Sequence, residues 1–242
     1  INTGTSIESS EKAIELAKKY DNLYAIVGIH PHHADKVSQG HGKQAKYDAD
    51  WIEQLEVLAR NPKVVGIGET GIDYYSYKSN DVVDPKLQKE VFIKQIELSL
   101  KLKLPLQIHN RQAGKDIVEI LEHYKSEFLN PPGMFHCMSG DIEHLKSVLD
   151  LGFYVGFDGN ITYDGIAKGE DTPLSQLVKY APIDRIVTET DSPFLTPIPH
   201  RGGRNLPSYV IIVGEFVAKI KNLSFEEVKK KTTENSRHIF KI

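Results

Sequence analysis

Four side chains of the kinds that bind metal ions each follow a short apolar, strand-like run. Glu69 ends the run VVGIGE, His109 ends LPLQIH, His136 ends GMFH and Asp191 ends RIVTETD. In a parallel α/β barrel the C-terminal ends of all strands meet at one face, so residues far apart in sequence converge there. Carboxylate and imidazole ligands suit Zn²⁺, Mn²⁺, Co²⁺ or Mg²⁺. The pattern therefore predicts one site for divalent metal ions, assembled from across the chain.

Each of these residues also has a purely structural interpretation. Glu69 could be a barrel-rim carboxylate in an ion pair, although a turn predicted at Thr70-Gly71 favours a presented side chain. His109 and His136 could each be a core histidine with satisfied hydrogen bonds, and Asp191 could cap a turn before a Ser-Pro pair. The matched positions at successive strand ends favour the metal site.

The elements that would position these residues alternate between strand-like and helical patterns, which is typical of βα units. Strands are predicted near residues 1–4, 23–29, 63–68, 105–109, 133–136, 153–157 and 185–189. Helices are predicted near 8–20, 49–60, 85–103, 112–123, 141–151, 173–180, 207–221 and 224–232, with capping-type residues at Ser9, Asp84 and Asp141. Segments 35–48 and 163–172, rich in Gly, Asp and Lys, are predicted loop insertions.

The strand count predicts an incomplete barrel. A closed barrel of this kind has eight strands, whereas the sequence predicts seven. The chain opens without Met on INTGTS, which is typical of the end of a strand. We therefore predict the α/β class and a TIM (β/α)8-type barrel with its first βα unit missing, in a single N-terminally incomplete domain, residues 1–242.

Composition narrows the class of protein. The 242 residues are 40% hydrophobic and 26% charged with a net charge of −3, which is typical of a globular chain with a substantial core. No apolar run approaches the roughly 20 residues of a transmembrane helix. Cys137, the single cysteine, excludes an intrachain disulfide and is expected to pack as a small buried residue. We expect a soluble, cytoplasmic protein without a broad nucleic-acid surface, and Lys229 to Lys231 are predicted to form a solvated helix face.

Three further residues are predicted to support the site. Glu189 would share a strand face with Asp191, two residues on, and is predicted to orient Asp191 or a neighbouring ligand from behind. Asp73, in GIDYY, is predicted to act in the same way. Arg111, two residues past His109, is predicted to bind a substrate phosphate through its guanidinium fork.

Other side chains have two open interpretations. His30, in GIHPH, either contacts substrate in the same pocket or braces the following proline, whereas His32 and His33 are expected to face outward.

Two further pairs also stay open. Arg201 and Arg204, in HRGGRN, either guide a nucleic-acid strand or lie in a solvated loop. Tyr74 and Tyr75 either offer a stacking surface to a base or pack at the barrel rim.

Five motifs in order resemble the signatures of the TatD family of metal-dependent deoxyribonucleases. They are GIHPH (28–32), GETGIDYY (68–75), QIHNRQA (107–113), FHCMSG (135–140) and ETDSPFLTP (189–197), and the likeness extends from INTGTSIESS to TTENSRHIF. The resemblance implies a TIM-barrel hydrolase with the family's ligand positions at Glu69, His109, His136 and Asp191. It also implies that Glu69 bridges two ions where two bind, and that in most members an HxH pair on the first strand adds ligands.

The chemistry of phosphodiester hydrolysis agrees with this resemblance. The reaction needs a nucleophilic hydroxide and neutralised charge on the non-bridging oxygens, and divalent metal ions provide both. Glu69 and Asp191 are predicted catalytic residues, and Asp191 could also exchange the proton of the water. We expect a deoxyribonuclease, an exonuclease, that hydrolyses DNA with metal-activated water and binds one or two Mg, Mn, Zn or Co ions per chain.

Two other functions stay open. One is a metal-dependent hydrolase of a small ester, amide or lactone, since a barrel does not fix its substrate. Such relatives commonly use a bridging carboxylated lysine, so Glu69 at the corresponding strand tip favours the nuclease. The other is a non-catalytic protein that binds metal poorly. The expected partner is the DNA substrate, with no membrane and no obligate protein partner.

Overall fold

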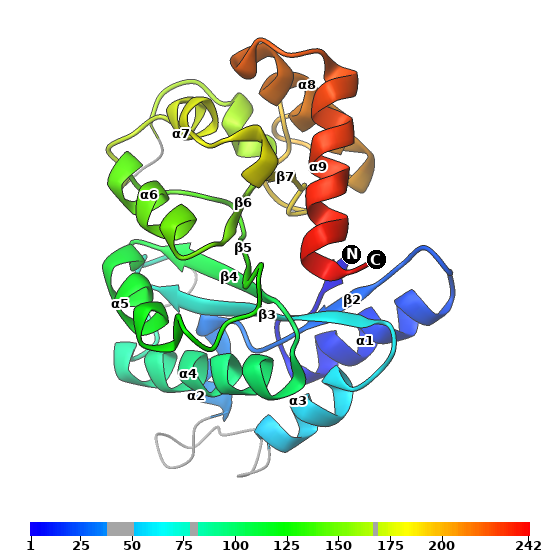
Figure 1. Ribbon diagram of the computed structural model, residues 1–242, viewed down its shortest axis with the longest axis vertical. Coiled ribbons are helices and arrows are strands. Elements are labelled where there is room, and N and C mark those ends of the chain that lie inside the picture. The colour runs from blue at the N-terminus through cyan, green and yellow to red at the C-terminus, as the bar shows by residue number, and fades with distance from the viewer. Residues whose placement is uncertain (38–50, 78–81, 167–168) are drawn as a thin grey trace. The chain divides into compact units, whose positions relative to one another are not determined.

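The computed structural model describes residues 1–37, 51–77, 82–166 and 169–242. Parallel strands and helices alternate along the chain (Figure 1), which confirms the predicted α/β class. The chain divides into two compact units, Ile1–Gly133 and Met134–Ile242. Among the described residues, no helix combines the length and the apolar character needed to cross a membrane.

The first unit is built on four strands in chain order. They are β1 (Asn2–Thr3), β2 (Ala25–Val27), β3 (Val64–Asp73) and β4 (Leu106–Arg111), each parallel to the next. The helices are α1 (Ile7–Lys18), α2 (Ala34–Val37), α3 (Trp51–Ala59), α4 (Pro85–Leu102) and α5 (Gly114–Tyr124), with a 3-10 turn at Pro31–His33. Ile26, Ile67, Phe92 and Ile108 are fully buried, so the core lies between these strands and helices, with α4 packed on β3.

The second unit repeats the pattern. Its strands are β5 (Gly133–Phe135, which starts at the last residue of the first unit), β6 (Tyr154–Phe157) and β7 (Ile186–Thr188). Its helices are α6 (Ile142–Asp150), α7 (Leu174–Tyr180), α8 (Val210–Lys221) and α9 (Phe225–Phe240), with 3-10 turns at Gly159–Thr162, Ile183–Arg185 and Pro207–Tyr209. Phe135, Phe153 and Phe157 fill the core of this unit.

All seven predicted strands and all eight predicted helices are present, with differences at their ends. Asp84 and Asp141 are helix N-caps, as predicted, but α1 is capped by Ser6, and Ser9 closes the capping box from inside the helix. The predicted end of the last helix at residue 232 is wrong, because polar Asn235 continues its buried face and donates to two backbone carbonyls. Residues 38–50 and 167–168, which belong to predicted loops and to the start of a predicted helix, lie outside the described residues.

The turn predicted at Thr70-Gly71 is wrong. Strand β3 continues through an irregular register to Asp73, and Thr70 and Gly71 pair with Ile108 and His109. Gly71, at φ +143°, lies so close to β4 that a Cβ atom would come within 2.0 Å of the His109 carbonyl oxygen. The glycine therefore permits a close approach of two strands. Since β4 also continues to Arg111, neither Glu69 nor His109 is the last residue of its strand.

Two buried glutamines of α4 brace the backbone of the neighbouring strands. The Gln95 amide accepts from the Ile29 N–H at 2.8 Å and donates to the Ile29 carbonyl at 3.0 Å. The Gln88 amide makes the same pair of bonds with Asp73, at 2.8 and 2.9 Å. Both side chains are fully buried, so these bonds are shielded from water and fix the backbone on which the candidate site stands.

Candidate functional site

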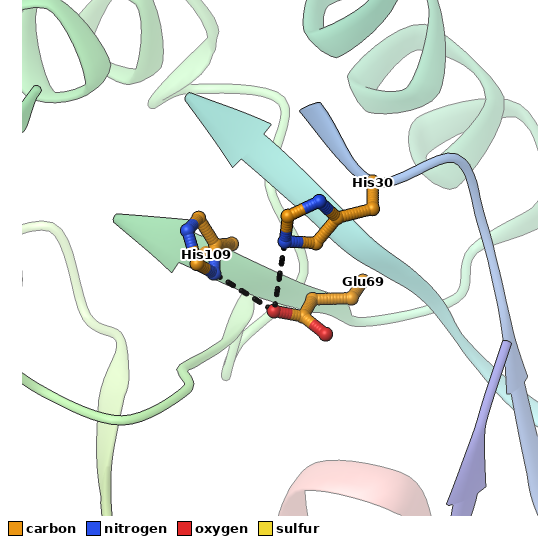
Figure 2. Close-up of side chains that lie close together, drawn as sticks. All are labelled: His30, Glu69 and His109. Atoms are coloured by element: carbon orange, nitrogen blue, oxygen red, sulfur yellow. Dashed lines mark hydrogen bonds and ion pairs between the residues drawn. The ribbon is translucent and has the colours of Figure 1, made fainter. Parts of the chain in front are cut away.

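His30, which follows β2, meets Glu69 of β3 and His109 of β4 (Figure 2). One possible ligand atom from each lies within 4.8 Å of the others. The Glu69 Oε1 atom is 3.5 Å from His30 Nε2 and 2.8 Å from His109 Nδ1. Two imidazoles and a carboxylate are donors that Zn²⁺ and related divalent ions accept. We call these three residues the first cluster.

His109 lies between two carboxylates, and this arrangement fits a cation. Its Nε2 faces the Asp73 carboxylate at 3.1 Å, while its Nδ1 faces Glu69 at 2.8 Å. Burial opposes a charged ring, but the hydrogen bonds to Asp73 and Glu69 outweigh it and raise the pKa of His109 to about 9. A proton therefore separates Nδ1 from the Glu69 carboxylate at neutral pH. A divalent ion that replaced this proton would be held by the same two atoms.

His30 has its proton placed differently. Its Nδ1 accepts the His32 backbone N–H at 3.1 Å, so the Nε2 atom that faces Glu69 carries the hydrogen of the neutral ring. Burial, reinforced by the nearby His109, lowers the pKa of His30 to about 3. In this state His30 donates towards Glu69, and its bond from the His32 N–H caps the turn that contains Pro31, in agreement with the bracing interpretation. His30 becomes a metal ligand only if the bond from His32 is given up. A contact of His30 with substrate stays a prediction.

Asp73 holds the His109 ring of the first cluster through the ring nitrogen that does not face Glu69. Its carboxylate is 1% exposed and accepts from His109 Nε2, His32 Nε2 (2.9 Å), the Tyr77 hydroxyl (3.1 Å) and the Tyr75 N–H (2.9 Å). Although burial favours the neutral acid, the hydrogen bonds from His109 and His32 keep the pKa of Asp73 well below its ordinary value. A carboxylate on one imidazole nitrogen directs the other nitrogen at a metal ion. The geometry thus supports the predicted role of Asp73.

The prediction that His32 and His33 face outward is wrong. His32 pairs with Asp73, and the His33 Nδ1–H donates to the Thr5 carbonyl at 2.7 Å. The 3-10 turn at Pro31–His33 turns both rings back onto the first unit. The GIHPH pattern alone does not reveal this turn.

Replacing Asp73 by asparagine is expected to weaken metal binding about 10- to 100-fold, because the amide no longer holds the His109 ring as a carboxylate does. Isothermal titration of the metal-stripped variant with Zn²⁺ or Mn²⁺ measures the change. The matched control is Asp116→Asn, which removes a carboxylate bonded to Tyr74 and Lys89 outside the cluster. Equal affinities of the Asp73 variant and the unmodified protein would contradict the positioning role.

A second cluster in the other unit has a similar design. It consists of His136, Glu189 and Asp191. His136 Nδ1 donates to Glu189 Oε2 at 2.6 Å, and its Nε2 faces Asp191 Oδ1 at 3.6 Å. The other Glu189 oxygen accepts the Cys137 N–H at 2.7 Å. Glu189 therefore directs the Nε2 atom of the imidazole towards the Asp191 carboxylate, where a cation would be favoured.

The backbone around the second cluster is adapted to it. Asp191 has φ +52°, a left-handed conformation that is uncommon for non-glycine residues and that Asp adopts more readily than most. A Cβ atom at Gly156 would come within 2.2 Å of Glu189 Oε1, so the glycine makes room for this carboxylate. Cys137 is only half-buried, not fully buried as expected, and its sulfur accepts from Asn160 at 3.2 Å.

Asp158 is a buried acid that the sequence interpretation missed. It is 0% exposed and accepts the Asn160 N–H at 2.9 Å. Burial, with repulsion from Glu189, raises the pKa of Asp158 to about 7. The signal was present, because Asp158 follows the apolar run of β6 as the four predicted ligands follow theirs.

The remaining predicted contacts are distributed over both units. The Arg111 guanidinium lies 5.2 Å from the centre of the Tyr75 ring, at the end of β4. Tyr74 instead donates to Asp116 at 2.5 Å.

The predicted site residues fall into two groups. Glu69, His109, His30 and Asp73 are brought together within the first unit, and His136, Glu189 and Asp191 within the second. That all the ligands serve one site stays a prediction.

The fold matches solved structures over nearly the whole chain. The TatD homologue YjjV of Escherichia coli K12 superimposes with a TM-score of 0.83 and 24% identity, which covers 99% of this chain and 85% of that chain. The protein therefore has the TIM-barrel-type α/β fold that the sequence predicts.

Curated relatives specify the family. The metal-dependent hydrolase YabD of Bacillus subtilis is 40% identical over 232 residues, 96% of this chain and 82% of the relative. The deoxyribonuclease Tat-D of Schizosaccharomyces pombe is 32% identical over a match that covers 97% of this chain and 80% of the relative. A family model described as TatD related DNase matches residues 1–241. The chain belongs to the TatD family of metal-dependent hydrolases, which confirms the resemblance seen in its motifs.

Proposed function

We propose that this protein is a deoxyribonuclease that removes nucleotides from DNA ends by hydrolysis and uses divalent metal ions bound by its two clusters. The observation that carries the proposal is the opposition of Glu69 and His109 Nδ1 at 2.8 Å, with Asp73 holding the other face of the imidazole. Two carboxylates around one imidazole favour a cation between the ring and Glu69. The second cluster repeats the arrangement with Glu189 behind His136 and Asp191 in front.

The residues of the two clusters have different proposed roles in the hydrolysis. A bound divalent ion would neutralise charge on the phosphate and lower the pKa of water. Glu69, His109, His136 and Asp191 are the proposed ligands, with Asp73 and Glu189 as positioning residues. The Asp191 side chain is 30% exposed, so its carboxylate can also take the proton of the attacking water.

Two groups of the first unit are suited to bind the phosphate. Arg111 offers a planar fork of N–H donors, which matches two phosphate oxygens at once. The neutral His30 ring directs its Nε2–H at the Glu69 carboxylate, where it can also donate to a phosphate oxygen. An ester or lactone needs neither contact, so these donors favour a phosphodiester substrate.

The relatives add support for DNA and leave the finer points to the proposal. The S. pombe relative is named a deoxyribonuclease, and this chain is 32% identical to it. The single free thiol at Cys137 is typical of a reducing compartment, and we propose that the enzyme acts in the cytoplasm.

A substrate panel tests the proposal. The metal-loaded protein is incubated with an end-labelled single-stranded oligonucleotide and, separately, with an aryl ester, an amide and a lactone. The expected result is a ladder of shortened DNA and no metal-dependent turnover of the small substrates. Turnover of an ester, amide or lactone with intact DNA would establish the small-molecule hydrolase instead.

A further inference from the structure

Residues 192–206, which directly follow Asp191, present an aromatic ring and positive charge on one loop. Phe194 is 67% exposed, and Arg201 and Arg204 are also exposed. The segment contains no acidic residue, although the chain as a whole has a net charge of −3. Among the described residues, neither guanidinium is paired with a carboxylate. We call this segment the Phe194 loop.

The loop fixes the backbone of Phe194 on both sides. The Phe194 N–H donates to the Asp191 carbonyl at 2.8 Å. The Asn205 side chain, in a residue that is 1% exposed, donates to the carbonyls of Phe194 and Thr190 at 2.6 Å each. The Asn205 N–H also donates to the Pro193 carbonyl at 3.2 Å. Phe194 is therefore held at a set distance from Asp191, and little order is lost when a ligand packs on its ring.

The far half of the loop is held in the same way. The Tyr163 hydroxyl donates to the Thr196 carbonyl at 2.8 Å, and the Thr196 hydroxyl donates to the Gly203 carbonyl at 2.7 Å. The Arg201 guanidinium stacks 3.9 Å from the centre of the Tyr163 ring. Arg204 precedes Asn205, the residue that binds the Phe194 carbonyl. The two positive charges are thus carried by the same ordered segment as the exposed ring.

A nucleotide matches this combination. A single exposed apolar side chain is common on protein surfaces and needs no ligand. An exposed aromatic ring on the same ordered loop as two guanidinium groups differs, because an unpaired base offers a π-face to the ring and its phosphates offer negative charge to the arginines. A protein partner would match the ring but would gain nothing from the two arginines unless it were acidic. The mixture of surfaces therefore favours single-stranded nucleic acid.

We infer that the Phe194 loop is a nucleotide-binding element, in which an unpaired base of the DNA substrate stacks on Phe194 while Arg201 and Arg204 contact the flanking phosphates. The inference rests on the proposed function and adds a specificity-determining residue to it. Because Phe194 is bonded to the Asp191 backbone, the stacked base belongs to a nucleotide at the end of the strand that is being cleaved.

The test compares two substrates and two proteins. One substrate is a labelled single-stranded oligonucleotide, and the other carries abasic nucleotides at its terminal positions at both ends. The unmodified protein and Phe194→Leu are assayed for kcat/KM on each, with the metal ion that supports cleavage. The unmodified protein is expected to lose about five- to 100-fold in kcat/KM on the abasic substrate, the usual range for one stacked base.

The variant makes the test specific for stacking. Phe194→Leu is expected to show the same loss on the ordinary oligonucleotide and no further loss on the abasic one, since the stacking partner is already gone. Phe194→Trp is expected to keep the kcat/KM of the unmodified protein. Tyr180→Leu, which removes an aromatic side chain that is 46% exposed at the end of α7, is the matched control and is expected to change nothing.

The outcomes separate this inference from the proposed function. If the unmodified protein cleaves DNA but the abasic penalty is the same in Phe194→Leu, the base does not stack on Phe194 and the inference is wrong. If the unmodified protein treats both substrates alike, the inference is also wrong. If it cleaves no DNA with any metal ion, the proposed function itself fails.

Discussion

The Glu69→Gln variant is expected to retain its fold and to lose metal-dependent cleavage of DNA by at least about a thousandfold. Glu69 Oε1 faces both histidines of the first cluster, so the amide removes the negative charge from that cluster. A bound divalent ion provides several kcal/mol of charge stabilisation in the transition state, and a loss of about 4 kcal/mol corresponds to about three powers of ten in rate. Single-turnover cleavage of end-labelled DNA measures the effect.

The control for this variant is Glu56→Gln, which removes a carboxylate of α3 that pairs with Arg60 and Lys101. It is expected to cleave DNA at the rate of the unmodified protein. Circular dichroism checks the fold, and elemental analysis of the dialysed proteins counts bound metal. Full activity of Glu69→Gln, with its metal content unchanged, would refute the proposed centre.

Removal of divalent ions is expected to abolish cleavage, and Mg²⁺, Mn²⁺, Zn²⁺ or Co²⁺ added back is expected to restore it. The raised pKa of His109, about 9, gives this restoration a pH dependence. The ring is protonated in the metal-free protein below pH 9, and an ion that binds Nδ1 must displace that proton. The apparent metal affinity is therefore expected to rise about tenfold per pH unit from neutral pH towards 9, and to level off above it.

The Asp191→Asn variant is assayed in the same experiment, with metal ions added back after their removal. It keeps the shape of the side chain at the second cluster but removes the charge that faces His136 Nε2. Added metal is expected to leave this variant inactive. Cleavage that persists in excess chelator, or an Asp191→Asn variant as active as the unmodified protein, would show that the hydrolysis does not depend on the metal site proposed.

Much of the architecture could be predicted because apolar strand-like runs and helix caps are local signals. The apolar runs before Glu69, His109 and His136 and the caps Asp84 and Asp141 depend on neighbouring residues, and each lies in or beside the predicted element. The turn prediction at Thr70-Gly71 is wrong because the sequence does not distinguish a glycine in a turn from a glycine that lets a neighbouring strand approach closely.

The parts of the site that escaped prediction depend on side-chain direction. The position of His30 follows from a hydrogen bond with His32 in a 3-10 turn, and the position of His32 follows from the buried Asp73 of another strand. Asp158 follows β6 in sequence, but its full burial and its bond from the Asn160 N–H become apparent only in the fold. Nothing in the local sequence reports which way such a side chain points, so tertiary packing decides it.

Helix α4 sets the spacing of two backbone segments next to the first cluster. Gln88 and Gln95 are separated by two turns, about 10 Å along the helix axis. They hydrogen-bond to the backbone of Asp73 in β3 and of Ile29, which follows β2 and precedes His30. A one-residue insertion between them would turn one amide by about 100° away from its strand. The helix therefore helps to fix the spacing between the backbone segments that carry Asp73 and His30. A change of metal ligands that is meant to alter the metal preference would leave this spacing in place, because two uncharged side chains outside the ligand set maintain it.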